Sequence, residues 1–332
     1  MQPFTVSRQA DAGSAIVAHG ADRTVAFIAG GTDLLGLIKD RAILPNHLLD
    51  INALPAMAAI DARSDGSVRI GALARMSDVA AHPAVRQRYP VVSESLLFAA
   101  SGQLRNMASI GGNIMQRTRC AYFRDGDDLP CNKRKPGSGC SALHGLNRSH
   151  AIFGWSDSCV ATHPSDLAVA LAALDATVHV RGLQGDREVP FLEFHRLPDD
   201  TPEKDNVLGR GDLIIAIEIP PRAEGRASHY LKVRDRQSYE FALVSTAAAV
   251  ATDGGNIRSA RLAMGGVAHK PWRLGAAEKA LRGLSLNDAP HLRAAIAESF
   301  TDDARPLAHN AFKVELAQRC VLRALQTAGA RA

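Results

Sequence analysis

Short apolar runs and helical spacings divide the first third of the chain into alternating elements. Strands are predicted at residues 24–28, 47–51 and 68–72. A glycine turn follows the first of these, and a helix is predicted over 34–38 with Thr32 as its N-cap. Residues 93–107 have helical character. These patterns indicate a compact domain that contains both helices and strands.

The second half of the chain resumes regular structure after residue 165. Leu167, Ala170, Leu171 and Leu174 follow the i, i+3, i+4, i+7 spacing of one helical face. Further strands are predicted at 177–181, 213–219, 230–233, 241–252 and 257–265, and helices at 288–300 and 309–328. Cys320 lies on the apolar stripe of the last helix, so it is predicted to be a core cysteine. The order is α+β, without repeats and without regular βαβ alternation.

Two breaks in the pattern suggest the domain organisation of the 332 residues. Residues 115–162 show no period, yet they contain four cysteines and a Lys-Arg-Lys run, so we expect an irregular insertion with a function. A second break, rich in proline and charge, falls at 221–228. We therefore predict one domain over 1–222 and a second over 223–332.

Composition and charge exclude several classes of protein. Apolar residues make up 46% and charged residues 22%, as in ordinary globular proteins. The net charge of +5 suits an anionic ligand or partner, but no nucleic-acid-binding motif accompanies it, so nucleic acid is not expected as a partner. No apolar run reaches the ~18–20 residues that span a membrane, and the N-terminus lacks the pattern of a signal peptide.

Two glycine pairs are the first candidates for binding chemistry. Gly30-Gly31 follows a predicted strand, and Gly111-Gly112 follows Ser109. Glycine has no Cβ, so backbone N–H groups can approach a phosphate closely, and the hydroxyls of Thr32 and Ser109 can add hydrogen bonds. Each pair alone is more typical of a simple tight turn, and only two pairs that the fold could bring together favour a phosphate site. The Rossmann and P-loop glycine motifs are both absent.

Four cysteines within the insertion are candidates for a metal site: Cys120, Cys131, Cys140 and Cys159. Their spacing lacks the close pairs of structural zinc sites and the close runs of bacterial ferredoxins. An iron–sulfur cluster, a zinc ion joined by His144 or His150, and free or bridged thiols all remain open on spacing alone.

At these motifs the chain resembles the FAD-binding subunits of the xanthine dehydrogenase family, also called molybdenum hydroxylases. The segments 27–34 and 108–114 look like the two FAD-phosphate motifs of that family, and 213–220 and 230–234 resemble two later landmarks. The resemblance implies a two-subdomain FAD-binding domain of the PCMH-like type, divided into 1–55 and 56–222. It also implies an antiparallel sheet with helices, like the CO dehydrogenase flavoprotein C-terminal domain, in the second half.

The resemblance also assigns cofactor-binding residues. They are Phe27, Ile28, Ala29, Gly30, Gly31, Thr32, Asp33, Leu34, Ser101, Ser109, Gly111, Gly112, Asn113, Asp166, Ile214 and Lys232. A cation such as Lys232 near the flavin favours its anionic reduced form. Taken without the resemblance, Lys232 could equally be a solvated surface lysine and Asp166 only a helix cap.

Most family members lack the cysteine-rich insertion, whereas a few carry one that holds a [4Fe–4S] cluster. These include 4-hydroxybenzoyl-CoA reductase and the periplasmic aldehyde oxidoreductase of enteric bacteria, and residues 117–140 look closer to the aldehyde enzyme. The resemblance therefore implies a [4Fe–4S] cluster on the four cysteines. The neighbouring arginines and lysines would offset its negative charge.

The implied function is electron relay within a larger enzyme. A molybdopterin-binding large subunit would oxidise an aldehyde, a [2Fe–2S] small subunit would carry the electrons, and the FAD of this chain would pass them to an acceptor. No catalytic residue is expected on this chain. Its relatives suggest a periplasmic location through co-export with a signal-bearing partner, and otherwise a cytoplasmic one. The rivals are a self-contained FAD oxidase or reductase, a 4-hydroxybenzoyl-CoA reductase-like subunit, and a zinc-stabilised binding module.

Overall fold

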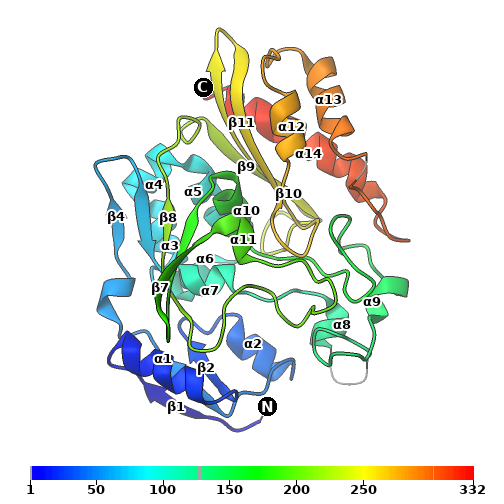
Figure 1. Cartoon of the computed structure of the whole chain (residues 1–332). Helices are drawn as coiled ribbons and strands as arrows, with labels where there is room; N and C mark the ends of the chain where they lie inside the picture. The colour runs from blue at the N-terminus through cyan, green and yellow to red at the C-terminus, as the bar shows by residue number, and fades with distance from the viewer. Residues whose placement is uncertain (1, 126–128, 302) are drawn as a thin grey trace.

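A small parallel sheet forms the N-terminal part of the computed structural model, which describes residues 2–125, 129–301 and 303–332. The strand order is β1-β3-β2, and this part of the chain is coloured blue in Figure 1. Its elements are β1 Thr5–Arg8, α1 Ala12–Ala21, β2 Val25–Ile28, α2 Leu34–Lys39 and β3 His47–Asp50. This βαβαβ unit is a local exception to the predicted lack of regular βαβ alternation, since the other two sheets are antiparallel. The pattern was weak because β1 is mostly exposed and α1 buries only Ala15 and Ile16.

A five-stranded antiparallel sheet, in the order β4-β5-β8-β6-β7, forms the next layer. Its strands are β4 Ile60–Ala62, β5 Val68–Gly71, β6 Thr177–Gly182, β7 Gly185–Pro190 and β8 Leu213–Ile219. The helices of this part are η1 Pro55–Met57, α3 Met76–Ala81, α4 Pro83–Arg88, α5 Pro90–Phe98, α6 Gly102–Met107, α7 Ile110–Ile114, α10 Asp166–Ala173 and α11 Phe191–Phe194. Every residue of α10 is buried, and the helix packs against α5 and the C-terminal strands.

The predicted helix over 93–107 is two helices in the structure, α5 and α6. Ala100 has a φ of 49°, a left-handed conformation that a continuous helix cannot contain. Ser101 then begins α6 as its N-cap, and its side chain accepts a hydrogen bond from the N–H of Leu104 at 3.3 Å. Ala99, Ala100 and Leu104 at this break line the large cleft described below.

The C-terminal part is an antiparallel sheet in the order β12-β11-β10-β9, covered by helices. Its elements are β9 Ser228–Val233, β10 Val244–Asp253, β11 Asn256–Gly265, β12 Trp272–Arg273, α12 Gly275–Ala280, α13 Ala289–Glu298 and α14 Phe312–Gly329. Helix α14 packs on β9 and β10. Cys320 is buried there, where its sulfur accepts a hydrogen bond from the Thr246 hydroxyl at 3.3 Å, so the core assignment is confirmed.

The cysteine-rich insertion is irregular, as predicted, apart from α8 Ala121–Arg124 and α9 Ser141–His144. One end packs against the N-terminal part, because Phe123 and Cys131 share a small apolar core with Leu37 of α2. The other end enters the C-terminal core, where Phe153 stacks on Trp272 with ring centroids 5.2 Å apart. The insertion therefore connects two parts of the molecule that are distant in sequence.

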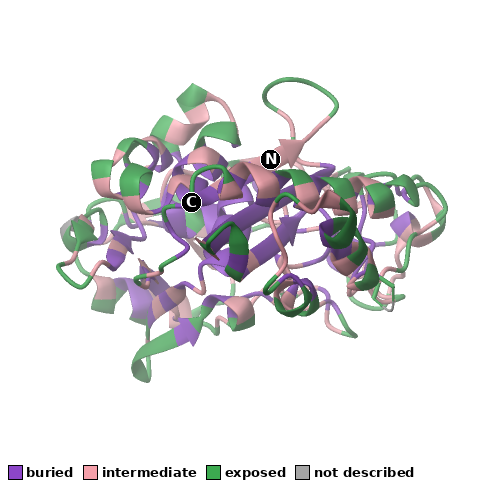
Figure 2. Ribbon diagram, turned by 90° about the horizontal axis from the view of Figure 1, so that it is seen from above, coloured by how far each residue is buried: buried purple, intermediate pink, exposed green. Residues whose placement is uncertain are grey.

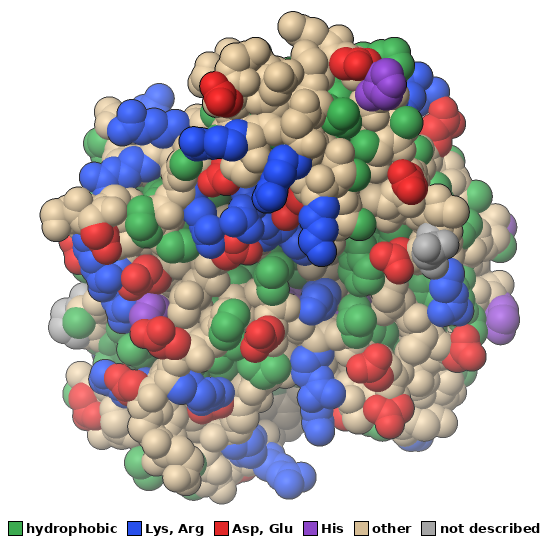
Figure 3. All heavy atoms as spheres, turned by 45° about the horizontal axis from the view of Figure 1, so that its top comes forward, with side chains coloured by type: hydrophobic (Ala, Val, Ile, Leu, Met, Phe, Trp, Pro, Cys, Tyr) green, Lys and Arg blue, Asp and Glu red, His purple; other side chains and the backbone are tan. Residues whose placement is uncertain are grey.

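Buried strands form the interior of the molecule, and exposed residues lie mainly on its outer helices and loops (Figure 2). Strands β8 and β10 are mostly buried, whereas the edge strands β1 and β7 are mostly exposed. Lys and Arg side chains gather on one part of the surface in Figure 3, in keeping with the positive net charge. Among the described residues, no helix combines the length and the apolar character needed to cross a membrane.

Candidate functional site

The turn that holds the first glycine pair lies against the backbone that leads into the second pair, although the two are far apart in sequence. A Cβ on Gly30 would lie 2.0 Å from the carbonyl oxygen of Met107, so the turn after β2 touches the backbone between α6 and α7. Gly31 has a φ of 70°, a conformation that favours glycine. A side chain at position 30 would collide with the Met107 carbonyl, so this close approach requires glycine there.

The second glycine pair is held by its neighbours on α7. Ser109 is the N-cap of this helix, and its Oγ accepts a hydrogen bond from the Gly112 N–H at 3.3 Å. Gly111 faces the other way, because its N–H donates to the carbonyl of Ala72 at 2.8 Å. Asn113 accepts a hydrogen bond from the Ser165 hydroxyl at 2.6 Å, which ties α7 to the start of α10.

A cleft of about 660 Å³ opens where these elements meet. Of the residues assigned to the cofactor, it is lined by Phe27, Ala29, Gly30, Gly31, Thr32, Asp33, Leu34, Ser109, Gly112, Asn113, Asp166 and Lys232. The other four lie outside this lining. Ile28 belongs to β2, Ser101 caps α6, Gly111 packs on Ala72, and Ile214 is buried in β8.

A buried ion pair lies at one side of the cleft. Lys232 Nζ lies 2.7 Å from Asp166 Oδ2, and the lysine side chain is 2% exposed. Asp166 Oδ1 accepts a hydrogen bond from the hydroxyl of Tyr230 at 2.6 Å. Burial, followed by the charge of Asp166, raises the pKa of Tyr230 well above its usual value. Lys232 is therefore not a solvated lysine, and the N-cap of α10 is Ser165 and not Asp166.

Tyr230 was absent from the residues expected at the site. The alternation of β9 carried the necessary signal, because residues two apart on a strand share one face, and Tyr230 lies two positions before Lys232.

Arginines of the insertion line the same cleft and bind Asp33. Asp33 Oδ1 accepts hydrogen bonds from Arg119 at 2.5 Å and Arg124 at 2.9 Å, and Oδ2 accepts one from the backbone N–H of Arg117 at 2.9 Å. Asp33, not Thr32, occupies the N-cap position of α2. Its carboxylate makes no capping hydrogen bond and accepts hydrogen bonds from the arginines instead. The sequence predicted these arginines only beside the cysteines, because no sequence pattern links them to Asp33, which lies more than 80 residues earlier.

All four cysteines of the insertion line a second, much smaller cavity of about 10 Å³. Cys131 and Cys140 form an isolated β-bridge across it, and Cys120 Sγ lies 3.2 Å from His150 Nε2. Burial raises the pKa of Cys120 to about 12 and that of Cys159 to about 11. Their thiols are free.

No group of three or more His, Cys, Asp or Glu side chains in the described part of the chain has an arrangement that could hold a metal ion. His150 touches one of the four cysteines, whereas His144 does not line their cavity. The structure thus brings the cysteines to one cavity without forming a preassembled coordination site.

A third cavity, of about 60 Å³, lies between the cleft and the cysteines. Arg119 and Asp166 line both this cavity and the cleft, while Thr118 and Cys120 line both this cavity and the cysteine cavity. The third cavity is therefore a neighbour of both the cleft and the cysteine cavity.

Two family models together account for most of the chain. Residues 2–222 match the FAD binding domain in molybdopterin dehydrogenase, and residues 229–328 match the CO dehydrogenase flavoprotein C-terminal domain. The fold is that of the Cu,Mo-CO dehydrogenase in its cyanide-inactivated form, whose matching chain has a TM-score of 0.77 and 21% identity over 100% of this chain and 99% of that one.

Curated relatives match over most of their length. The aldehyde oxidoreductase FAD-binding subunit PaoB of Escherichia coli is 45% identical over 100% of both chains. The glyceraldehyde dehydrogenase medium chain of Sulfolobus acidocaldarius is 30% identical over 79% of this chain and 74% of its own. With its glycine-lined cleft and both domains in place, this chain belongs to the FAD-binding subunits of the molybdenum hydroxylase family.

Proposed function

We propose that this chain is the electron-transferring FAD subunit of a molybdenum-dependent aldehyde oxidoreductase, and that it carries a [4Fe–4S] cluster as well. The observation that carries the proposal is the juxtaposition of a glycine-lined cleft with a cavity lined by four cysteines. The aldehyde substrate follows from the full-length similarity to the Escherichia coli subunit. The domain division at residues 222 and 223 belongs to the same proposal.

The residues of the cleft fit a flavin dinucleotide. Gly30 and Gly31 line the cleft without side chains, so a pyrophosphate could approach their backbone closely, and Thr32 and Ser109, which carry hydroxyls, line the same cleft. Asp166 keeps the ammonium of Lys232 at the wall of the cleft. FAD, when bound, accepts electrons singly and delivers them as a pair. The chain's own contribution is to bind, orient and shield this group.

The four thiols fit a soft metal cluster better than a hard cation. Sulfur ligands suit iron–sulfur cores, and the small cavity brings the four side chains to one place. Since burial raises the pKa of Cys120 and Cys159, binding of a cluster would displace their protons. The third cavity, which touches both sites, supports a location of the cluster near the flavin.

The partners and the location belong to the same proposal. We expect a molybdopterin-binding large subunit and a [2Fe–2S] small subunit, with neither nucleic acid nor direct membrane insertion. A signal on a partner would carry the folded complex to the periplasm, and without such a signal the complex would remain cytoplasmic. Fractionation of cells with and without that signal distinguishes the two.

A self-contained FAD oxidase or reductase is the second candidate, because two ionisable residues also line the cleft. Tyr239 and Glu240 lie on its wall, near Lys232 in sequence. Turnover of an aldehyde by the isolated chain would favour this candidate over the subunit role. A subunit like that of 4-hydroxybenzoyl-CoA reductase is distinguished by the substrate of the purified complex.

The test of the proposed function is an absorption spectrum of anaerobically purified protein, before and after dithionite. Flavin bands over a broad, bleachable iron–sulfur shoulder, with about four irons per chain, are the expected result. Flavin bands with stoichiometric zinc would rule out the cluster and leave the proposal of an FAD subunit in place. Protein that neither contains nor takes up FAD would overturn the proposal.

A further inference from the structure

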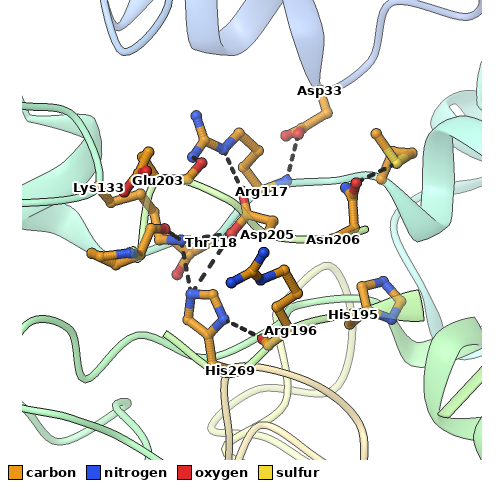
Figure 4. Close-up of polar contacts among 12 residues, drawn as sticks. Asp33, Arg117, Thr118, Lys133, His195, Arg196, Glu203, Asp205, Asn206 and His269 are labelled. Carbon is orange, nitrogen blue, oxygen red and sulfur yellow. Dashed lines mark hydrogen bonds and ion pairs between the residues drawn. The ribbon is translucent and has the colours of Figure 1, made fainter. Parts of the chain in front are cut away.

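A buried cluster of charges lies where the insertion meets the segment before β8 and the loop after β11 (Figure 4). At its centre, Asp205 makes one ion pair through each carboxylate oxygen. Oδ2 accepts a hydrogen bond from Arg117 Nε at 2.6 Å, and Oδ1 accepts one from Lys133 Nζ at 2.6 Å. The lysine side chain is 1% exposed, so this is an interior ion cluster.

The two cations face different cavities. Arg117 lines the large cleft, and Lys133 lines the cysteine cavity. These two cavities share no lining residue, and Asp205 lines neither of them. One carboxylate therefore holds a cation for each site while it stays outside both.

The charges of this cluster do not cancel. Burial lowers the pKa of His269 to about 4, so at neutral pH this ring is uncharged. Its Nε2 accepts from Lys133 at 2.8 Å, and its Nδ1 donates to the carbonyl of Arg196 at 2.9 Å. Burial alone would raise the pKa of Asp205, but Arg117 and Lys133 together hold it far below its usual value. Two cations and one anion remain.

We propose that Asp205 is a positioning residue that couples the two redox sites, because its charge balances the cation at the flavin cleft and the cation at the cysteine cavity. The inference rests on the proposed function. Reduction adds negative charge to either group, so any cation left without its anion stabilises the reduced form. Loss of the Asp205 charge should raise both reduction potentials together.

The experiment is a redox titration of the purified holoprotein, in its complex, with flavin absorbance and the iron–sulfur EPR signal as separate readouts. Asp205→Asn is expected to raise both midpoint potentials. Lys133→Met is expected to lower the iron–sulfur potential and, because Asp205 then balances Arg117 alone, to lower the flavin potential by less. Opposite signs for the two variants distinguish electrostatic coupling from general loosening of the structure.

Asp212→Asn is the matched control. Asp212 forms an equally close pair with Arg187, 2.7 Å away, at the edge of the five-stranded sheet, and it lines none of the three cavities. This variant is expected to shift neither potential. A shift at only one site in Asp205→Asn, or at neither, would overturn the inference.

Two further outcomes are decisive. If Asp205→Asn does not fold, Lys133→Met and Arg117→Met carry the test, because Asp205 is then left with one cation fewer and each change must lower both potentials, most strongly at its own site; any other pattern overturns the inference. If the unmodified protein lacks an iron–sulfur signal, the proposed cluster fails before any variant is measured, and the coupling falls with it.

Discussion

Gly30→Ala is predicted to weaken FAD binding, because Gly30 lines the cleft and lies against the backbone of Met107, just before the second glycine turn. The new Cβ would lie 2.0 Å from the Met107 carbonyl oxygen and 2.7 Å from its carbon, both backbone atoms. Ordinary contact begins at 3.4 Å, so the turns must separate by 3.4 − 2.0 = 1.4 Å or distort. Overpacking of this kind costs about 1–3 kcal/mol. If the cost falls on the bound state, it corresponds to about 5- to 150-fold weaker binding.

The assay is a fluorescence titration of FAD into deflavinated protein, with thermal unfolding measured in parallel. Gly275→Ala is the control, since a Cβ there meets nothing within 4 Å and the residue begins helix α12. That control is expected to keep its FAD affinity. If Gly30→Ala binds FAD as tightly as the unmodified protein and melts at the same temperature, the close approach of the two turns does not matter for binding, and the reasoning is refuted.

Three further predictions concern the buried charges and thiols. Lys232→Met should cost about 3–5 kcal/mol of stability by leaving Asp166 as a buried charge without its cation, and combining it with Asp166→Asn should recover part of that loss in urea unfolding. His195, buried and with its pKa lowered to about 4, stays neutral in the folded protein, so the unfolded chain binds more protons between pH 6.5 and pH 4. This ring should therefore contribute a fall in stability of about 1.4 kcal/mol per pH unit as the pH drops through that window, and His195→Gln should remove that contribution from the slope measured by urea unfolding between pH 7 and pH 4.5, while other buried histidines keep the rest; an unchanged slope would contradict this. Cys120→Ala should lower the iron content and the iron–sulfur signal, whereas Cys320→Ala should keep both and only lower the melting temperature; equal iron in the two proteins would remove Cys120 from the ligands.

The fold was predictable from sequence where the pattern was strong. Strands β8, β10 and β11 and helix α14 lie within a few residues of their predicted bounds, because long apolar runs or a sustained helical stripe mark them. The N-terminal strand and helix were missed because they bury little. The break at Ala100 was missed because a single left-handed residue leaves no periodic trace.

The candidate site was predictable in its glycine motifs and cysteines, but not in the charges that surround them. Asp33 and Arg124 are 91 residues apart and Lys133 and Asp205 are 72 residues apart, and no local pattern links either pair. Asp205 itself stands in an irregular segment between α11 and β8. Such pairs depend on the tertiary arrangement of segments that are distant in sequence, which no local pattern encodes.

The cysteine-rich insertion contributes side chains to two separate apolar cores of this subunit. Phe123 and Cys131 complete the apolar core beside α2, and Ile152 and Phe153 complete the core beneath α14. Excising residues 115–162 would therefore uncover apolar surface at two distant places and remove the cations that hold Asp33 and Asp205. The insertion is therefore an integral part of this fold, and a chain from which it is deleted would need other apolar and basic side chains at both places.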